Sequence, residues 1–168
     1  MDRIILCGFM GCGKSTVGRL LAQRLGYSFA DTDAYVEWQA NRSIPELFAQ
    51  EKEAGFRRRE TEACRELAAR TQVVLATGGG TLLNPQNLAL LRPGSSILYL
   101  YISPETACRR LRDDTLRPLL QVPDREAVIR RLWATRDPLY RAVADHVVSA
   151  QGAPAETVEK AAQLFCEK

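Results

Sequence analysis

The stretch Gly8-Phe9-Met10-Gly11-Cys12-Gly13-Lys14-Ser15 decides the fold of this chain. It fits the pattern G-x-x-x-x-G-K-[S/T], in which glycines let successive backbone N–H groups turn inward around phosphate oxygens. A short apolar run at residues 4–7 precedes it and is typical of a buried strand, while a helical pattern over Lys14–Leu25 follows it. Because a phosphate-binding loop requires this strand–loop–helix context, we prefer it over a chance glycine-rich turn.

The side chains of this loop predict how a nucleotide would be held. Lys14 can reach the terminal phosphates, and the Ser15 hydroxyl can ligate Mg²⁺, a hard cation that prefers oxygen. The N-terminus of the following helix adds partial positive charge. The predicted ATP contacts in the loop are Gly11, Cys12, Gly13, Lys14, Ser15 and Thr16.

Working outward, predicted strands alternate with predicted helices. The strands are expected at residues 4–7, 28–31, 73–76, 96–102 and 147–148, and helices are expected to begin near Ser43, residue 53, Pro85, Pro104, Asp124 and Pro154. This alternation predicts an α/β fold, a five-stranded parallel sheet with helices on both faces, in one domain spanning residues 1–168. Ligands of such sheets bind beyond the carboxyl ends of the strands.

Composition excludes several classes of function. The chain has 168 residues, 46% hydrophobic and 26% charged, and its net charge of +3 is too mild to demand nucleic acid or a membrane surface. No apolar run reaches the ~20 residues of a membrane span, and no leader pattern opens the chain, so we expect a cytoplasmic protein. Five cysteines without a C-x-x-C pair indicate neither a disulfide framework nor a zinc site.

Two carboxylates follow the second predicted strand, in Asp31-Thr32-Asp33. In an alternating segment both side chains point the same way, toward the phosphates. Asp31 could then hold Mg²⁺ through water, and Asp33 could accept a hydroxyl proton or orient the attacking oxygen. A helix-capping role for Asp33 is an equally weighted alternative.

Gly78-Gly79-Gly80 follows the third predicted strand at the same sheet edge. Three glycines in a row are costly in backbone entropy. Either the loop needs positive φ angles or something approaches the backbone closely, and a plain turn is the alternative. The position at the active edge favours contact with a substrate.

Three arginines complete the pattern. Glu60 lies one helical turn from Arg57 and could orient it toward an anion, although an ordinary surface ion pair would look the same. Arg117 lies in an irregular stretch, about residues 112–123, that we interpret as a mobile lid delivering a cation to a transferring phosphoryl group. Arg136 could clamp a carboxylate. The alternative for the Arg117 stretch is a plain surface loop, and the alternative for the Arg136 segment is a helix cap with its proline. The residues alone therefore predict a small phosphotransferase whose acceptor is a hydroxylated anion.

In combination these motifs resemble shikimate kinases over nearly the whole chain. The matching segments, in the order of that family, are Gly8 to Ser15, Asp31-Thr32-Asp33, Gly55-Phe56-Arg57 with Glu60, Gly78-Gly79-Gly80, Arg117-Pro118-Leu119-Leu120 and Arg136-Asp137-Pro138-Leu139-Tyr140. The resemblance implies the nucleoside-monophosphate-kinase-like variant of the P-loop NTPase fold. It also implies transfer of the ATP γ-phosphate to the 3-hydroxyl of shikimate, a step toward chorismate and the aromatic amino acids.

The resemblance also implies roles for individual residues. Asp33 would bind the ring hydroxyls and position or deprotonate the nucleophile, and Arg57 and Arg136 would grip the carboxylate. Gly78, Gly79 and Gly80 would line the ring, Arg117 would close on the phosphates, and Arg110 and Pro154 would flank adenine. The acceptor would bind over about residues 32–60, and we expect a monomer with small-molecule substrates only. The alternatives are another small-metabolite kinase, such as one acting on gluconate, and a non-catalytic ATP-binding module.

Overall fold

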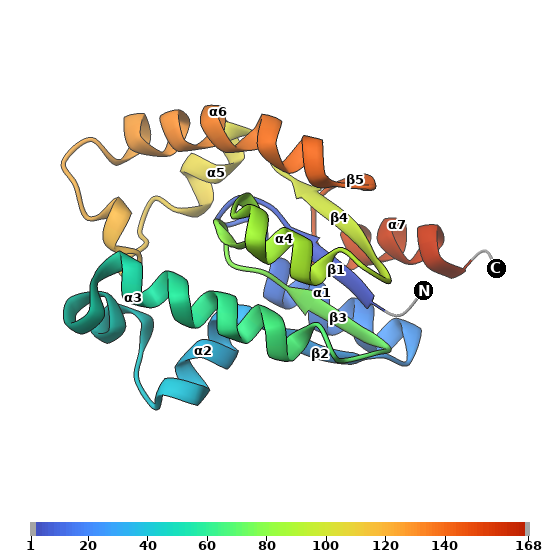
Figure 1. Ribbon diagram of the computed structural model, residues 1–168. Helices are drawn as coiled ribbons and strands as arrows, with labels where there is room; N and C mark the ends of the chain where they lie inside the picture. Colours follow the sequence, from blue (N-terminus) through green and yellow to red (C-terminus); the bar gives the residue numbers. More distant parts are fainter. Residues whose placement is uncertain (1–2, 167–168) are drawn as a thin grey trace.

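The computed structural model describes residues 3–166 and contains one five-stranded sheet (Figure 1). The strands are β1 (Arg3–Cys7), β2 (Ser28–Asp31), β3 (Val73–Ala76), β4 (Ser95–Tyr101) and β5 (His146–Ser149). They lie in the order β2-β3-β1-β4-β5 and every neighbouring pair is parallel. The predicted α/β fold with a parallel sheet is confirmed, and no strand bound differs by more than one residue from the bound expected.

The register of the strands brings the predicted site segments to one edge of the sheet. Asp31 of β2 pairs with Ala76 of β3, and Ala76 pairs with Leu6 of β1. The loops that follow these three strands therefore leave the sheet side by side. This edge is the place where ligands of parallel sheets bind.

Helices cover both faces of the sheet, as expected from the alternating pattern. Helices α1 (Lys14–Leu25) and α7 (Pro154–Cys166) pack together on one face, while α3 (Ile44–Leu67), α4 (Pro85–Leu91) and α6 (Arg125–Val143) lie on the other (Figure 1). Helices α2 (Thr32–Ala40) and α5 (Pro104–Arg110) pack against α3 and α6 respectively. Strands β1 and β3 are buried along their whole length, which explains their uninterrupted apolar sequences.

Helix termini follow the local sequence signals closely. Ser43 and Glu46 form a capping box in which the Ser43 backbone N–H donates to Glu46 Oε2 at 2.7 Å. Asn84, Ser103 and Asp124 cap their helices through side-chain oxygens, as their positions predict. The expected helix starts near Pro85, Pro104 and Asp124 are thus confirmed.

One local expectation was wrong. Asp31, Thr32 and Asp33 are not an alternating extended segment, because Thr32 begins α2 and Asp31 is its N-cap, accepting hydrogen bonds from the N–H groups of Asp33 and Ala34. The two helices expected to begin near Ser43 and residue 53 are both present, because α3 consists of two helical stretches on either side of a kink at Lys52, where φ is 61° and ψ is −177°. The stretch 112–123 is irregular except for a 3₁₀ turn at Pro118–Leu120.

Within residues 3–166, no helix combines the length and the apolar character needed to cross a bilayer.

Candidate active site

The loop between β1 and α1 has the backbone of a phosphate cradle. Gly8, Gly11 and Gly13 have φ angles of 149°, 81° and 88°, which side chains with a Cβ rarely adopt. A Cβ at Gly8 would also lie 2.7 Å from the carbonyl oxygen of Leu100. Gly13 is the N-cap of α1 and supplies no side-chain cap, so the first N–H groups of the helix face the cavity and can bind an anion.

Lys14 curls back over this loop. Its Nζ donates to the carbonyl oxygens of Gly8 at 2.7 Å and Phe9 at 3.3 Å, and Cys12 Sγ lies 3.6 Å away. These contacts hold the ammonium group above the turn of the loop. Phosphate oxygens that enter the cradle would meet both the ammonium and the helix N-terminus.

Ser15 and Asp31 present two oxygen ligands side by side. Ser15 Oγ donates to Asp31 Oδ2 at 2.6 Å, while the other oxygen of Asp31 caps α2. This oxygen pair fits Mg²⁺, which takes few protein ligands and completes its shell with water and nucleotide phosphates. In keeping with that mode of binding, residues 3–166 contain no cluster of three or more acidic, histidine or cysteine side chains that could hold a metal alone.

Asp33 lies where two cavities meet. One cavity, about 450 Å³, is lined by the phosphate loop with Ser15, Asp31, Arg110 and Arg117. The other, about 430 Å³, is lined by the following residues: Met10, Asp33, Ile44, Phe48, Glu53, Phe56, Arg57, Glu60, Gly78, Gly79, Gly80, Arg117, Pro118, Leu119 and Arg136. The two cavities share Met10, Asp33, Gly78, Gly79 and Arg117. A group in the second cavity can therefore reach the phosphate end of the first.

The protonation of Asp33 suits proton transfer near neutral pH. Burial, together with the negative charges of Asp31 and Glu60, raises the pKa of its carboxyl to about 6, while the charge of Lys14 opposes this shift. A carboxylate with this pKa is a better general base than an exposed aspartate. The capping role weighed for this position belongs to Asp31 instead.

The structure shows why residues 78–80 are all glycine. None of Gly78, Gly79 and Gly80 has a positive φ. A Cβ on Gly78 would lie 2.7 Å from Asp33 Oδ1, one on Gly79 would lie 3.2 Å from Arg136 Nη1, and one on Gly80 would lie 3.1 Å from Arg57 Nη1. A Cβ here would crowd the ends of three polar side chains, so the second of the two predicted reasons applies, because neighbouring groups approach the backbone closely. Contact of this loop with a substrate stays a prediction.

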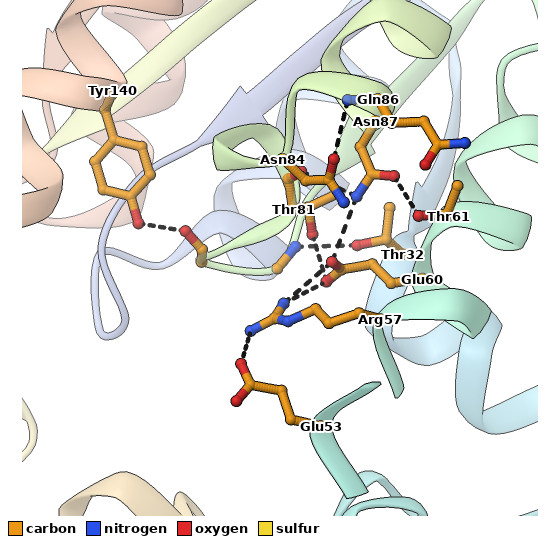
Figure 2. Close-up of polar contacts among 12 residues, drawn as sticks. Thr32, Glu53, Arg57, Glu60, Thr61, Thr81, Asn84, Gln86, Asn87 and Tyr140 are labelled. Atoms are coloured by element: carbon orange, nitrogen blue, oxygen red, sulfur yellow. Dashed lines mark hydrogen bonds and ion pairs between the residues drawn. The ribbon is translucent and has the colours of Figure 1, made fainter. Parts of the chain in front are cut away.

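Arg57 is held by a buried carboxylate rather than by a surface ion pair. Glu60 is 1% exposed and accepts from Arg57 Nη1 at 3.1 and 3.2 Å through both of its oxygens (Figure 2). Thr81 Oγ1 donates to Glu60 at 3.0 Å and Asn87 Nδ2 at 3.4 Å. Glu53 pairs with the other guanidinium nitrogen, Arg57 Nη2, at 3.5 Å. The guanidinium is thereby aimed into the second cavity.

The other two predicted arginines reach the same place from other elements. Arg136 of α6 lines the second cavity, and none of the ion pairs within residues 3–166 involves it. Arg117 lines both cavities and pairs with Asp114 in the same irregular segment. The guanidinium groups of Arg57 on α3 and Arg136 on α6 thus face the second cavity, and Arg117 lines both cavities.

Arg110 and Pro154 meet in a smaller cavity of about 240 Å³ beyond the phosphate loop. The Arg110 guanidinium donates to the carbonyl oxygen of Gly11 at 3.1 Å and to that of Ala150 at 2.9 Å. It therefore ties the phosphate loop to the segment between β5 and α7.

Sequence reasoning missed the apolar wall and part of the support of the site. Ile44 and Phe48 line the second cavity, and no motif singled them out. Thr32 accepts a hydrogen bond from the Gly78 N–H at 3.0 Å, and the Tyr140 hydroxyl donates to the Gly79 carbonyl at 2.6 Å (Figure 2). The spacing of Tyr140, one helical turn after Arg136, was the available signal for the last of these.

Together, the phosphate loop on a parallel sheet and the adjoining cationic cavity define a P-loop phosphotransferase for small molecules. The shikimate kinase family model matches residues 10–166. A shikimate kinase from Halorhodospira halophila is 50% identical over 95% of this chain and 90% of its own length, and one from Neisseria meningitidis serogroup C is 47% identical over 87% and 86%. The solved structure of shikimate kinase from Acinetobacter baumannii in complex with shikimate superposes with a TM-score of 0.93 at 42% identity, over 99% of this chain and 93% of that one.

The chain belongs to the shikimate kinase family. The fold, the phosphotransferase class and the use of ATP follow from this membership. The resemblance inferred from the motifs is confirmed.

Proposed function

We propose that this protein transfers the γ-phosphate of ATP to the 3-hydroxyl of shikimate, giving shikimate 3-phosphate on the route to chorismate and the aromatic amino acids. The observation that carries the proposal is the position of Asp33, which lines both the phosphate cavity and the acceptor cavity. Membership of the shikimate kinase family supports it. A non-catalytic ATP-binding module would have no need of a second cavity joined to the first through a carboxylate.

The acceptor is gripped at one end and activated at the other. Arg57 and Arg136 bind the carboxylate as two charged donors, and the backbone of Gly78 to Gly80 lines the ring. Asp33 binds the ring hydroxyls, orients the 3-hydroxyl and takes its proton as the oxygen attacks phosphorus. The apolar side chains of Ile44, Phe48 and Phe56 line the same cavity and limit the access of water to this end.

The phosphates are held by the residues of the loop. Lys14 and the N-terminus of α1 bind the terminal phosphates, and Arg117 closes on them from the lid at about residues 112–123 as charge spreads over the phosphoryl oxygens. Ser15, and Asp31 through water, would hold Mg²⁺, which when bound would supply positive charge beside the phosphate oxygens. Gly11, Cys12, Gly13 and Thr16 complete the ATP site, while Arg110 and Pro154 flank adenine.

The proposal treats residues 1–168 as one kinase domain in which residues 32–60 form the acceptor-binding segment. Both substrates bind within a single chain, so a monomer suffices for the reaction. We propose that the enzyme acts in the cytoplasm, where ATP is available as the phosphate donor.

A coupled ADP-release assay tests the function directly. The protein is supplied with Mg²⁺ and ATP, together with shikimate, gluconate or no acceptor. We expect ADP release that depends on shikimate and stays at the acceptor-free level with gluconate. Equal rates in all three reactions would overturn the acceptor assignment, and a preference for gluconate would assign the site to a different kinase.

A further inference from the structure

Tyr140 belongs to the segment Arg136-Asp137-Pro138-Leu139-Tyr140, of which the proposed function uses only the arginine. It is 1% exposed although its hydroxyl is polar. Arg136 and Tyr140 lie one turn apart on α6, so their side chains leave the same face of the helix. A buried hydroxyl beside a substrate-binding arginine needs a partner, and the identity of that partner indicates its role.

The partner is the backbone of the glycine loop. The Tyr140 hydroxyl donates to the carbonyl oxygen of Gly79 at 2.6 Å (Figure 2). A Cβ on Gly79 would lie 3.2 Å from Arg136 Nη1 and 3.6 Å from the Tyr140 oxygen. The guanidinium, the phenol and this residue of the loop therefore meet at one point, and burial raises the pKa of the phenol, which keeps it a neutral donor.

The same loop is tied to other elements on its remaining sides. The Gly78 N–H donates to Thr32 Oγ1 of α2 at 3.0 Å, and Thr81 Oγ1 donates to Glu60 of α3 at 3.0 Å. Glu60 in turn holds Arg57. The loop thus lies between the two arginines, fixed to the Arg57 side by Thr81 and to the Arg136 side by Tyr140.

We propose that Tyr140 is a positioning residue for the acceptor carboxylate, acting by fixing the glycine loop to α6 at the distance that lets Arg136 and Arg57 grip one carboxylate together. Two charged donors on different helices can share a carboxylate only if their separation is held within a few tenths of an ångström. This inference rests on the proposed function, since it takes the acceptor to carry a carboxylate. It assigns no chemical step to Tyr140.

Tyr140→Phe tests the role by removing one oxygen while keeping the ring. The carboxylate is gripped in the ground state and in the transition state alike, so loosening the grip raises KM and leaves kcat nearly unchanged. We expect the KM for shikimate to rise about tenfold, the size of effect given by one weakened charged contact, with the KM for ATP unchanged.

Tyr99→Phe is the matched control. The ring of Tyr99 lies 5.2 Å from that of Tyr140, and its hydroxyl donates to Asp137 Oδ1 at 2.7 Å rather than to the loop. Both variants lose the hydrogen bond of a buried phenol, so both should lose thermal stability. Only Tyr140→Phe should raise the KM for shikimate. Equal KM values for the two variants would overturn the proposal.

A double-mutant cycle tests whether Tyr140 acts through Arg136. In an Arg136→Ala background, Tyr140→Phe should raise the KM no further, and an acceptor with a carboxamide in place of the carboxylate should not distinguish Tyr140→Phe from the unmodified protein. Additive effects, or an equal loss with the carboxamide, would reduce Tyr140 to a structural residue and overturn the inference.

If Tyr140→Phe does not fold, Gly79→Ala provides a second test of the proposal. It places a methyl group between Arg136 and Tyr140 and should raise the KM for shikimate selectively; an unchanged KM would overturn the proposal. The proposed function fails separately: if the unmodified protein does not phosphorylate shikimate, the acceptor is wrong. If it does, and all these variants keep its KM, Tyr140 has no positioning role.

Discussion

Asp33 is the residue on which the proposed chemistry depends, because it borders both cavities and its carboxyl has a raised pKa. Its environment combines burial, which opposes ionisation, with Asp31 and Glu60, which oppose it further, and Lys14, which favours it. The arrangement keeps a base available at neutral pH without an adjacent histidine. The single histidine, His146, packs edge-on against Phe165 instead.

The pH dependence of turnover follows from this pKa. Only the ionised carboxylate can accept a proton, so kcat/KM for shikimate should fall about tenfold per pH unit below a pKa of about 6 and be level above it. Asp33→Asn should reduce kcat by about 10²- to 10⁴-fold while ATP binding persists. Steady-state rates between pH 5 and 8 measure the pH profile and the fall in kcat, and nucleotide titration measures ATP binding by Asp33→Asn. A flat profile, or near-normal turnover by Asp33→Asn, would contradict the assigned role.

The same group predicts how stability changes with pH. Its pKa is about 6 in the folded protein against 3.8 for the unperturbed side chain, so the folded state binds the proton more tightly. The free energy of unfolding therefore falls as pH rises from about 4 to 6, and the loss persists above that range. Asp33→Asn removes this loss and should raise the free energy of unfolding by about 1–3 kcal/mol at pH 7.5, with little gain near pH 4. Denaturant unfolding at both pH values measures it; a gain independent of pH would contradict the electrostatic cause.

At the scale of elements, α3 carries the acceptor arginine and contains the least regular backbone of any helix in residues 3–166. Lys52 has φ 61° and ψ −177°, and at this kink the helix turns before it reaches Arg57. Its ammonium group donates only locally, to the Ala49 carbonyl at 3.4 Å. The conformation is one that glycine adopts without strain and that other residues adopt at a cost of about 1–3 kcal/mol.

Lys52→Gly should therefore stabilise the protein. The relief of strain exceeds the roughly 0.5–1 kcal/mol that glycine costs through the freedom of the unfolded chain, so we expect a net gain of about 1 kcal/mol and a Tm increase of about 2–4 °C. Lys52→Ala is the control, because it shortens the side chain and keeps the Cβ that causes the strain. Equal melting temperatures for the two variants would show that the kink stores no strain.

Helices and strands were predicted correctly where a helix start is marked by a local cap. The prediction was wrong where the same sequence fits both a strand and a helix. Ser43 with Glu46 and Asn84 with Pro85 mark helix starts through contacts within one turn, so the sequence alone reveals them. Asp31 and Asp33 fit both an alternating strand and a capped helix. The capped helix forms, as α2, and it packs against α3. The break before residue 53 was predicted from the sequence, but the positive φ of Lys52 has no sequence signal, because lysine is not a residue that favours a positive φ.

At the scale of the whole molecule, the parallel sheet explains why a short motif set predicts so much of the site. Parallel strands bring the loops after Cys7, Asp31 and Ala76 to one edge, so residues far apart in the sequence are placed together by topology alone. The apolar wall and the support from Tyr140 and Thr32 depend on side-chain packing between elements. Apart from the spacing of Tyr140, one helical turn after Arg136, that packing leaves no periodic or spacing signal in the sequence.

The most direct measurement is a crystal structure of the protein with shikimate and a non-hydrolysable ATP analogue. We predict the 3-hydroxyl oxygen within hydrogen-bonding distance, ~3 Å, of the Asp33 carboxylate and in line with the terminal phosphorus, with the acceptor carboxylate between Arg57 and Arg136. A complex in which shikimate turns its carboxylate toward Lys14, or lies outside the cavity that Asp33 borders, would contradict the account.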